Sequence, residues 1–212
     1  TRAPAHSTAA IRTMSAHPRL WLALFGMLLL FGCDPQQPQY RAAMQQLLQG
    51  DHRAAALTLH TLAENGHAPA QLRLGLLYRL GLGVPRNLRL AVYWFEKAAR
   101  QDNVGGQYWL AESYRRGEGV PISPELAFQG FHRLAERGYA PAQYQVALAY
   151  AAGRGVAHED PSAVHWLQRA ALGGHVEAAR RLARAYRVGE LGLPRDPRRA
   201  VEWEWKIQPV RF

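Results

Sequence analysis

The side chains best suited to acid–base chemistry lie together in one short segment, His158-Glu159-Asp160. An imidazole beside two carboxylates could relay a proton or contribute to a metal site. Asp160, however, is followed by Pro161, and an aspartate before a proline is typical of the start of a helix. We therefore interpret the segment as a capping loop and predict no catalytic residue in it.

Histidine spacing gives no stronger signal for a metal site. His52, His60 and His67 lie seven or eight residues apart, whereas two zinc ligands on one helix are usually about four residues apart. The sequence places no third ligand type beside them. We predict neither a metal site nor a cofactor.

Serine and glycine motifs also lack the surroundings that catalysis or nucleotide binding needs. Gly-x-Gly-Val segments recur, but they follow predicted helices and have neither a preceding strand nor a phosphate-binding lysine. Three serines lack the sharp strand-to-helix turn that exposes a nucleophile: Ser113, Ser123 and Ser162. The chain is therefore not expected to be an enzyme, and an envelope hydrolase stays only as an alternative.

The single cysteine, Cys33, stands just after an apolar run that covers residues 20–31. One cysteine cannot form an internal disulfide bond or a multi-cysteine zinc site. The run is shorter than the roughly 20 residues that a membrane-spanning helix needs, but it fits the apolar part of a secretory signal, about 7–15 residues long. Arg19 and the segment from Met14 supply the positively charged start of such a signal.

The segment that ends at the cysteine, Leu30-Phe31-Gly32-Cys33, resembles the lipobox of bacterial lipoproteins. The resemblance implies that Cys33 is acylated, becomes the new amino terminus and anchors the chain to a membrane. Residues 1–32 are then an upstream segment with a lipoprotein signal peptide, and residues 33–39 form a polar tether. The expected location is the bacterial cell envelope, facing the periplasm, on either the inner or the outer membrane.

The strongest pattern in the chain is a repeat of 36 residues. Four tyrosines keep this interval: Tyr78, Tyr114, Tyr150 and Tyr186. A glycine follows each tyrosine by three residues, and alanines further along keep the period until the last one arrives one residue late, at Ala200. The extra residue falls in segment 189–193, as a loop insertion of the kind that repeat arrays tolerate.

Each unit is predicted to hold two helices around a glycine turn. In the first unit, Gln71, Leu74, Gly75 and Tyr78 share one helical stripe through their three- and four-residue spacing. The paired glycines after the tyrosine end that helix, because glycine adopts a left-handed backbone without steric cost. Four residues are predicted to cap the second helices: Asn87, Ser123, Asp160 and Asp196.

This pattern, Ala-x-Ala-Gln-x-x-Leu-Gly-x-x-Tyr-x-x-Gly-x-Gly-Val followed by Ala-x-x-Trp-x-x-x-Ala-Ala, resembles the Sel-one-like repeat, a branch of the tetratricopeptide superfamily. The resemblance implies an all-α fold, a right-handed α-solenoid of helix-turn-helix repeats with about four to five units. The units are a degenerate opening repeat at 40–67, full repeats at 68–103, 104–139 and 140–175, and a final repeat and cap at 176–212. Gly130 stands where Trp94 and Trp166 lead one to expect tryptophan, so the second full repeat is expected to pack more loosely.

In tetratricopeptide-like arrays, the first-helix side chains outside the buried stripe line a concave surface. By this resemblance, the predicted partner-binding residues combine aromatic, aliphatic and arginine side chains, which interface hot spots favour. They are Leu72, Leu76, Arg79, Tyr108, Glu112, Arg115, Tyr144, Leu148, Arg180, Arg184 and Arg187. The last three arginines fit a solvated face equally well.

Composition and charge leave two main hypotheses for the function. With 48% hydrophobic and 20% charged residues, the chain is typical of a globular protein. Its net charge of +10 comes mainly from arginine, which we interpret as coding bias, so nucleic acid is not an expected partner. The leading hypothesis is a lipid-anchored scaffold that binds another envelope protein or peptide, because similar repeat lipoproteins take part in exopolysaccharide export and envelope assembly. The alternative is binding of an anionic polymer by the arginine-rich C-terminal repeat.

Overall fold

The computed structural model describes residues 36–206, and within this range every regular element is an α-helix. The described residues from Pro38 onward belong to one compact unit. The predicted signal peptide, Cys33 and the first part of the tether lie outside the described residues. Among the helices of the described part, none is both long enough and apolar enough to cross a membrane.

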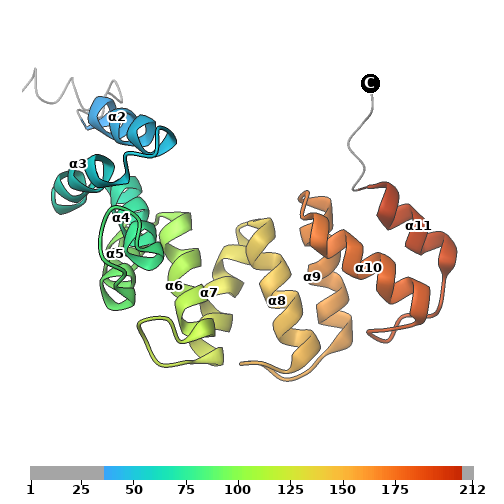
Figure 1. Cartoon of the computed structure of the whole chain (residues 1–212). Helices are drawn as coiled ribbons and strands as arrows, with labels where there is room; N and C mark the ends of the chain where they lie inside the picture. The colour runs from blue at the N-terminus through green and yellow to red at the C-terminus, as the bar shows by residue number, and fades with distance from the viewer. Residues whose placement is uncertain (1–35, 207–212) are drawn as a thin grey trace, which may run out of the picture. The chain divides into compact units, whose positions relative to one another are not determined.

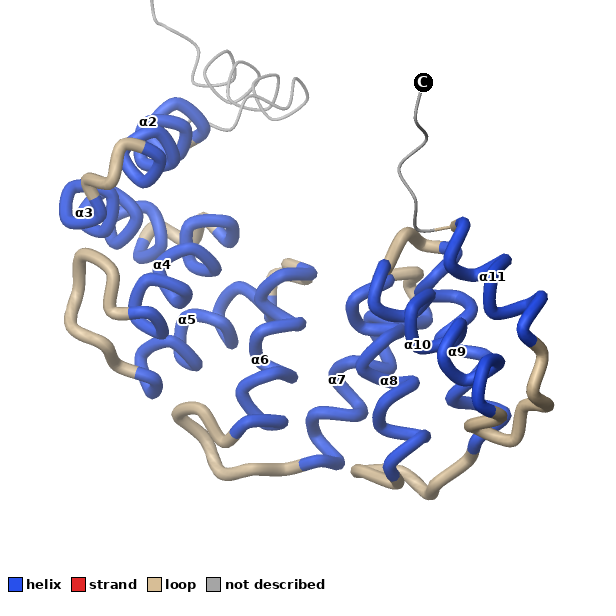
Figure 2. The backbone as a smooth tube through the Cα atoms, turned by 45° about the vertical axis from the view of Figure 1, so that its right-hand side comes forward, coloured by secondary structure: helices blue, strands red, loops and turns tan. Residues whose placement is uncertain are grey.

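The helices follow one another in pairs, and each pair is one repeat (Figure 1). The first helices are α2 (Gln37–Leu48), α4 (Ala68–Leu80), α6 (Val104–Arg116), α8 (Ala140–Ala152) and α10 (Val176–Val188). The second helices are α3 (His52–Glu64), α5 (Leu88–Arg100), α7 (Pro124–Glu136), α9 (Asp160–Leu172) and α11 (Pro197–Trp205). Loops join the two helices of each full repeat (Figure 2). The predicted α-solenoid of 36-residue repeats is therefore confirmed.

Side-chain caps explain where most second helices begin. Three of the predicted caps accept a hydrogen bond from a backbone N–H in the first turn of their helix: Asn87, Ser123 and Asp196. The prediction is wrong for Asp160, which is the first residue of α9, while Glu159 occupies the cap position without a side-chain cap bond. The Glu159 carboxylate instead accepts a hydrogen bond from the Ser162 hydroxyl at 2.8 Å.

The Gly-x-Gly segment that follows α4, α6 and α8 has two structural roles. Gly81 ends α4 in the left-handed conformation, with φ of 74°, because no Cβ opposes it. The second glycine of the segment brings the loop close to the preceding repeat. A Cβ on Gly83 would lie 2.1 Å from the carbonyl oxygen of His52, and one on Gly155 would lie 2.1 Å from that of Pro124. The motif therefore joins neighbouring repeats. This packing role explains why the motif recurs, and nucleotide binding is not needed to explain it.

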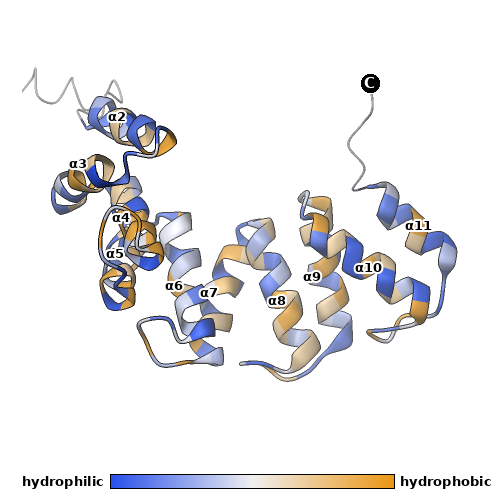
Figure 3. Ribbon diagram, viewed as in Figure 1, coloured by the Kyte–Doolittle hydropathy of each residue, from blue (hydrophilic) through white to orange (hydrophobic). Residues whose placement is uncertain are grey.

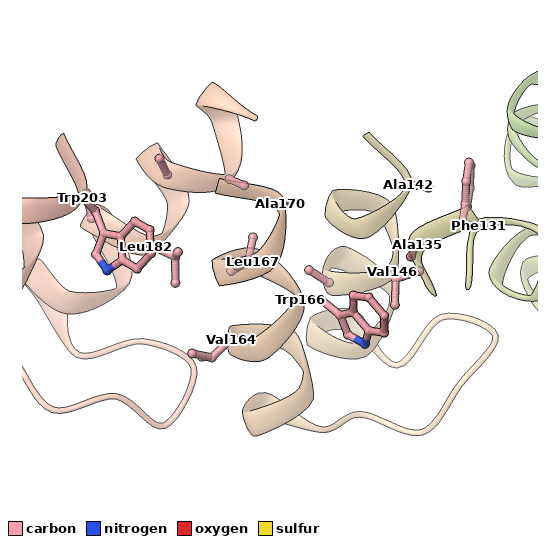
Figure 4. Packing of buried hydrophobic residues seen from close by; sticks show 14 of the residues in the cluster. Phe131, Ala135, Ala142, Val146, Val164, Trp166, Leu167, Ala170, Leu182 and Trp203 are labelled. Carbon is pink, nitrogen blue, oxygen red and sulfur yellow. The ribbon is translucent and has the colours of Figure 1, made fainter. Parts of the chain in front are cut away.

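Repeated aromatic residues form much of the core between the helices. Trp94, Trp166 and Trp203 of the second helices are buried. Figure 4 shows Trp166 beside Val146 of α8 and Trp203 beside Leu182 of α10. The ladder tyrosines are buried or half-buried, and the backbone carbonyl of each one accepts a hydrogen bond from the residue that precedes the second helix. The aromatic ladder thus holds the two helices of a repeat together.

The opening repeat begins earlier than the sequence predicted. Helix α2 starts at Gln37, so residues 37–39 of the predicted tether are helical. Pro38 lies in the first turn of this helix, where a missing backbone N–H removes no hydrogen bond. Asp51 then caps α3 by accepting a hydrogen bond from the Ala54 backbone N–H at 3.1 Å. The pair α2 and α3 therefore has the same helix–turn–helix order as the full repeats.

The second full repeat differs from the others at Gly130 on α7. A Cβ on Gly130 would lie 2.8 Å from the Cβ of Ala111, so α6 and α7 approach closely at this point. Beside the contact lies a hollow that is lined by α5, α6 and α7. The space that an indole would fill is therefore left as a hollow next to a tight helix contact.

Candidate interaction surface

An apolar hollow opens between the first helices of two adjacent repeats. It is lined by α6, α7, α8 and their loops, and its volume is about 360 Å³. Its apolar side chains are Ile122, Pro124, Ala127, Phe128, Phe131, Leu148 and Ala149. This volume falls near the lower end of the range for ligand pockets, about 300–1,000 Å³. We call it the first-helix hollow.

Two guanidinium groups border the first-helix hollow, from Arg115 and Arg154, and no acidic side chain lines it. Arg115 is held in place, since its Nε and Nη2 each lie 2.7 Å from an oxygen of Glu112. Arg154 stands between the two glycines that follow α8 and is exposed. Within residues 36–206 its side chain has no ion pair or hydrogen bond. An apolar wall therefore lies beside an uncompensated positive charge.

Glu112 is a buried carboxylate whose partners are arginines of its own helix, so it is not available to a partner protein. It accepts hydrogen bonds from both Arg115 and Arg116. Burial opposes ionisation, but the two hydrogen bonds outweigh it and hold the pKa of Glu112 below its usual value. Glu112 thus fixes the position of Arg115 at the edge of the hollow, while its own side chain is buried.

Arg79 links one repeat to the next. Its Nε lies 2.6 Å from Oε2 of Glu118, and its guanidinium stacks over the Trp109 ring at 4.6 Å from the centroid. The Arg79 side chain is only 16% exposed. Leu72, on the same helix, lies against Gly105 of α6, where an added Cβ would be 2.4 Å from its Cδ2. Leu76 is half-buried. These residues of α4 contribute mainly to packing between repeats.

Tyr108 and Tyr144 contact aromatic rings of their own repeats. The ring of Tyr108 lies 5.4 Å from that of Phe131 and 5.7 Å from that of Tyr139. Burial raises the pKa of the Tyr108 hydroxyl. Tyr144 stacks on His175 at 4.5 Å between ring centroids, and His175 caps α10. Both tyrosines are half-buried, so only part of each ring faces solvent.

The three C-terminal arginines are exposed and locally neutralised. Arg180 pairs with Glu177, Arg187 pairs with Glu204, and Arg184 lies 3.3 Å from Glu190. Figure 3 shows hydrophilic residues recurring along α10 between hydrophobic ones. This arrangement favours a solvated face over a concentrated cationic site.

The His158 segment shows no arrangement for catalysis. His158 is exposed, with Nδ1 3.1 Å from the Ala151 carbonyl oxygen and Nε2 3.4 Å from Asp160. Within the part of the chain that the structure describes, no three potential metal ligands of His, Cys, Asp or Glu type lie together. The segment belongs to the loop that precedes α9.

Sequence reasoning found Arg115 and Leu148 of the first-helix hollow but missed its other eight lining residues, of which three show why. Phe128 lies on a second helix, and Ile122 and Arg154 lie in loops. The expectation considered first helices alone, so it could not include them. One signal was present: an arginine between two repeat glycines at 153–155.

Comparison with known proteins identifies the family. The Sel1 repeat pattern matches residues 68–103, 104–139, 140–175 and 176–203. The chain therefore belongs to the Sel1 repeat family. A comparison with curated proteins found no match.

Two solved structures share this fold. A Sel1 repeat protein from Oxalobacter formigenes is 27% identical, with a TM-score of 0.68 over 74% of this chain and 63% of that chain. A protective antigen of uropathogenic Escherichia coli with an SLR fold is 34% identical, with a TM-score of 0.67 over 72% of this chain and 32% of that chain. The chain thus spans less than two thirds of either relative. The Sel1-repeat fold commonly mediates protein–protein interaction and is typically not enzymatic.

Proposed function

We propose that this protein is an interaction scaffold of the bacterial cell envelope that binds another envelope protein or peptide in the first-helix hollow. The Sel1 family supports the general class of function. The observation that carries the site is an apolar wall of Phe128, Phe131 and Leu148 next to the unpaired Arg154.

The chemistry of the hollow defines the partner segment. A bulky apolar side chain would displace water from the aromatic wall. A carboxylate next to it would pair with Arg154, while Arg115 stays engaged with Glu112. Charge pairing of this kind mainly sets orientation and association rate, and the apolar anchor supplies most of the affinity. We therefore expect a segment with an apolar anchor beside an acidic group.

A photocrosslinking amino acid at Leu148 tests this site in cells. It should yield a discrete crosslinked product with a partner, and Arg154→Glu should reduce the yield several-fold. The matched control places the same photoprobe at Leu172, an exposed residue at the end of α9. Equal crosslinking from both positions, or a Leu148 product that is insensitive to Arg154→Glu, would refute binding at the hollow.

Attachment through an acylated Cys33 is the second part of the proposal. Its support is the short apolar run that ends at the only cysteine of the sequence. A helix array on a short tether would hold the hollow close to a bilayer surface, where membrane-bound partners are concentrated. The part of the envelope that it faces is proposed to be the periplasm, and assembly or polymer export is the proposed process.

Binding of an anionic polymer by the C-terminal repeat is less well supported, because Arg180, Arg184 and Arg187 each have an acidic neighbour. The two functions differ in their response to salt. Counterion-driven binding weakens steeply as salt rises, whereas apolar docking at the hollow should change little. A steep salt dependence would favour the polymer.

A further inference from the structure

A second hollow lies on the second-helix side of the array, at the position of a missing indole. Trp94, Trp166 and Trp203 occupy one position of their repeats and are only 4%, 8% and 8% exposed. Gly130 occupies this position on α7, exactly one period from Trp94 and from Trp166. The hollow beside Gly130 has a volume of about 860 Å³, open to solvent. We call it the indole hollow.

The walls of the indole hollow are suited to an apolar ring. Leu110, Ala111 and Tyr114 of α6 line it together with Leu126 of α7. In the third full repeat, the corresponding space is closed by Trp166, which packs in the core with Ala147 and Val146. The second full repeat therefore offers a similar apolar floor without a ring of its own.

A cationic side chain lies next to the position of the missing tryptophan ring. In the three repeats that have this tryptophan, the residue three positions after it lies over the indole: Lys97 at 5.5 Å, Arg169 at 5.0 Å and Lys206 at 4.1 Å from the ring centroid. Arg133 has the same position relative to Gly130 and lines the hollow. It is exposed, and within residues 36–206 it has no ion pair, side-chain hydrogen bond or aromatic partner. Its charge is complementary to the negative face of an aromatic ring.

The opposite edge of the hollow favours an indole over a phenyl ring. His60 and His132 meet Trp94 and Trp166 edge-on, at 5.9 Å and 5.5 Å. The residue one period after His60 is Glu96, and it lines the indole hollow. Glu96 accepts a hydrogen bond from Arg100 through Oε2, at 3.4 Å. Its other carboxylate oxygen can accept one from an indole N–H, a donor that a phenyl ring lacks.

We propose that the indole hollow binds a tryptophan side chain from a segment of a partner protein. The inserted ring lies on the floor formed by Leu110 and Tyr114, beneath the guanidinium of Arg133, with its N–H toward Glu96. The site takes over in trans the packing that Trp94 and Trp166 provide within their own repeats. It is separate from the first-helix hollow, so either site can fail without the other.

N-acetyl-tryptophanamide is the probe, and N-acetyl-leucinamide is the control compound. Titration into the ¹⁵N-labelled chain should give saturable shifts of the amide signals around residues 110, 130 and 133 with the tryptophan compound alone. Arg133→Gln should weaken binding about three- to tenfold. Arg169→Gln is the matched control, because its guanidinium lies over the chain's own Trp166, and it should leave binding unchanged.

A second variant closes the hollow without disturbing the tight contact at Gly130. Leu126 is 45% exposed at the rim, so Leu126→Trp can place an indole in the hollow while the helix stays folded, as circular dichroism would verify. This variant should lose binding of the probe. Absence of saturable shifts in the wild type, equal shifts with the leucine compound, or unchanged binding in Arg133→Gln would overturn the proposal.

The exposed Trp205 of a second copy is the competing occupant, since it is 67% exposed. Sedimentation of the wild type and of Trp205→Ala separates the two cases. A monomeric wild type agrees with a partner protein. Self-association that is lost in both Trp205→Ala and Leu126→Trp would assign the hollow to a second copy and overturn the proposed partner.

Discussion

Replacing Glu112 with glutamine tests whether one buried carboxylate organises the edge of the first-helix hollow. The Glu112 side chain is 5% exposed and accepts hydrogen bonds from Arg115 and Arg116. A glutamine oxygen can accept one of these bonds, but both arginines would lose their counter-ion. Breaking a fully buried ion pair costs about 3–5 kcal/mol. Because the arginines are 38% and 46% exposed, water compensates part of the loss, and we expect the free energy of unfolding to fall by about 1.5–2.5 kcal/mol.

The loss should depend on pH in a defined direction. Burial raises the pKa of Glu112 and the arginine hydrogen bonds lower it, with a net value below the ordinary 4.5. The unfolded chain therefore takes up the proton first as the pH falls. The stability that the carboxylate provides is complete above the unfolded-state pKa and is lost as the pH falls through the folded-state pKa. Wild type and Glu112→Gln should differ most near neutral pH and converge in acid.

Urea unfolding followed by circular dichroism at several pH values measures this difference. Glu136→Gln is the matched control, since the Glu136 side chain is 61% exposed, and it should change the free energy of unfolding by less than about 0.5 kcal/mol. If Glu112→Gln is as stable as the wild type at neutral pH, or if the difference does not change with pH, the two arginines do not depend on this carboxylate.

Acylation, loop geometry and the tyrosine ladder each allow a further test. Cys33→Ser should abolish incorporation of a fatty-acid analogue in growing cells, and persistent labelling would contradict acylation at this cysteine. Gly155→Ala should lower the free energy of unfolding by about 1–3 kcal/mol in thermal unfolding, because the added Cβ would meet the Pro124 carbonyl oxygen. Gly138→Ala is the control and should lower it less, because Gly138 also has a left-handed backbone but has open space around it. Tyr114→Ala should cost about 2–3 kcal/mol in urea unfolding, below the range for a fully buried aromatic residue, because Tyr114 borders the indole hollow; an unchanged curve would show that its ring does not support the fold.

Most of the fold was predictable because the repeat sets local structure at every unit. Equal spacing from Tyr78 to Tyr186 placed the helices in register, and Gly81 placed the end of α4. The errors lie at element boundaries. The prolines near residue 38 predict a tether, but proline is accepted in the first turn of a helix, and α2 begins at Gln37. Asp160 resembles a cap by type, but the cap position depends on backbone angles that its neighbour Glu159 adopts.

The candidate site was predictable only in part. Helical spacing identified Arg115 and Leu148 as outside the buried stripe, but spacing cannot show that Arg79 reaches Glu118 across 39 residues. Nor can it show which arginines find an acidic neighbour and which, like Arg154, do not. Ion pairs between repeats depend on how adjacent units stack. The departure at Gly130 was visible in the sequence, whereas the shape of the hollow beside it required the structure.

The contact of the second glycine with the preceding repeat makes three of the junctions between units alike. The three pairs are Gly83 with His52, Gly119 with Leu88, and Gly155 with Pro124. Since each glycine meets a backbone carbonyl, this contact does not depend on which side chain the preceding repeat carries there, whereas the Arg79–Glu118 pair between two repeats does. The cassette at 104–139 is the exception in terms of binding, because it contributes to both hollows. Exchanging this one cassette would therefore alter both hollows at once while leaving the glycine contacts possible.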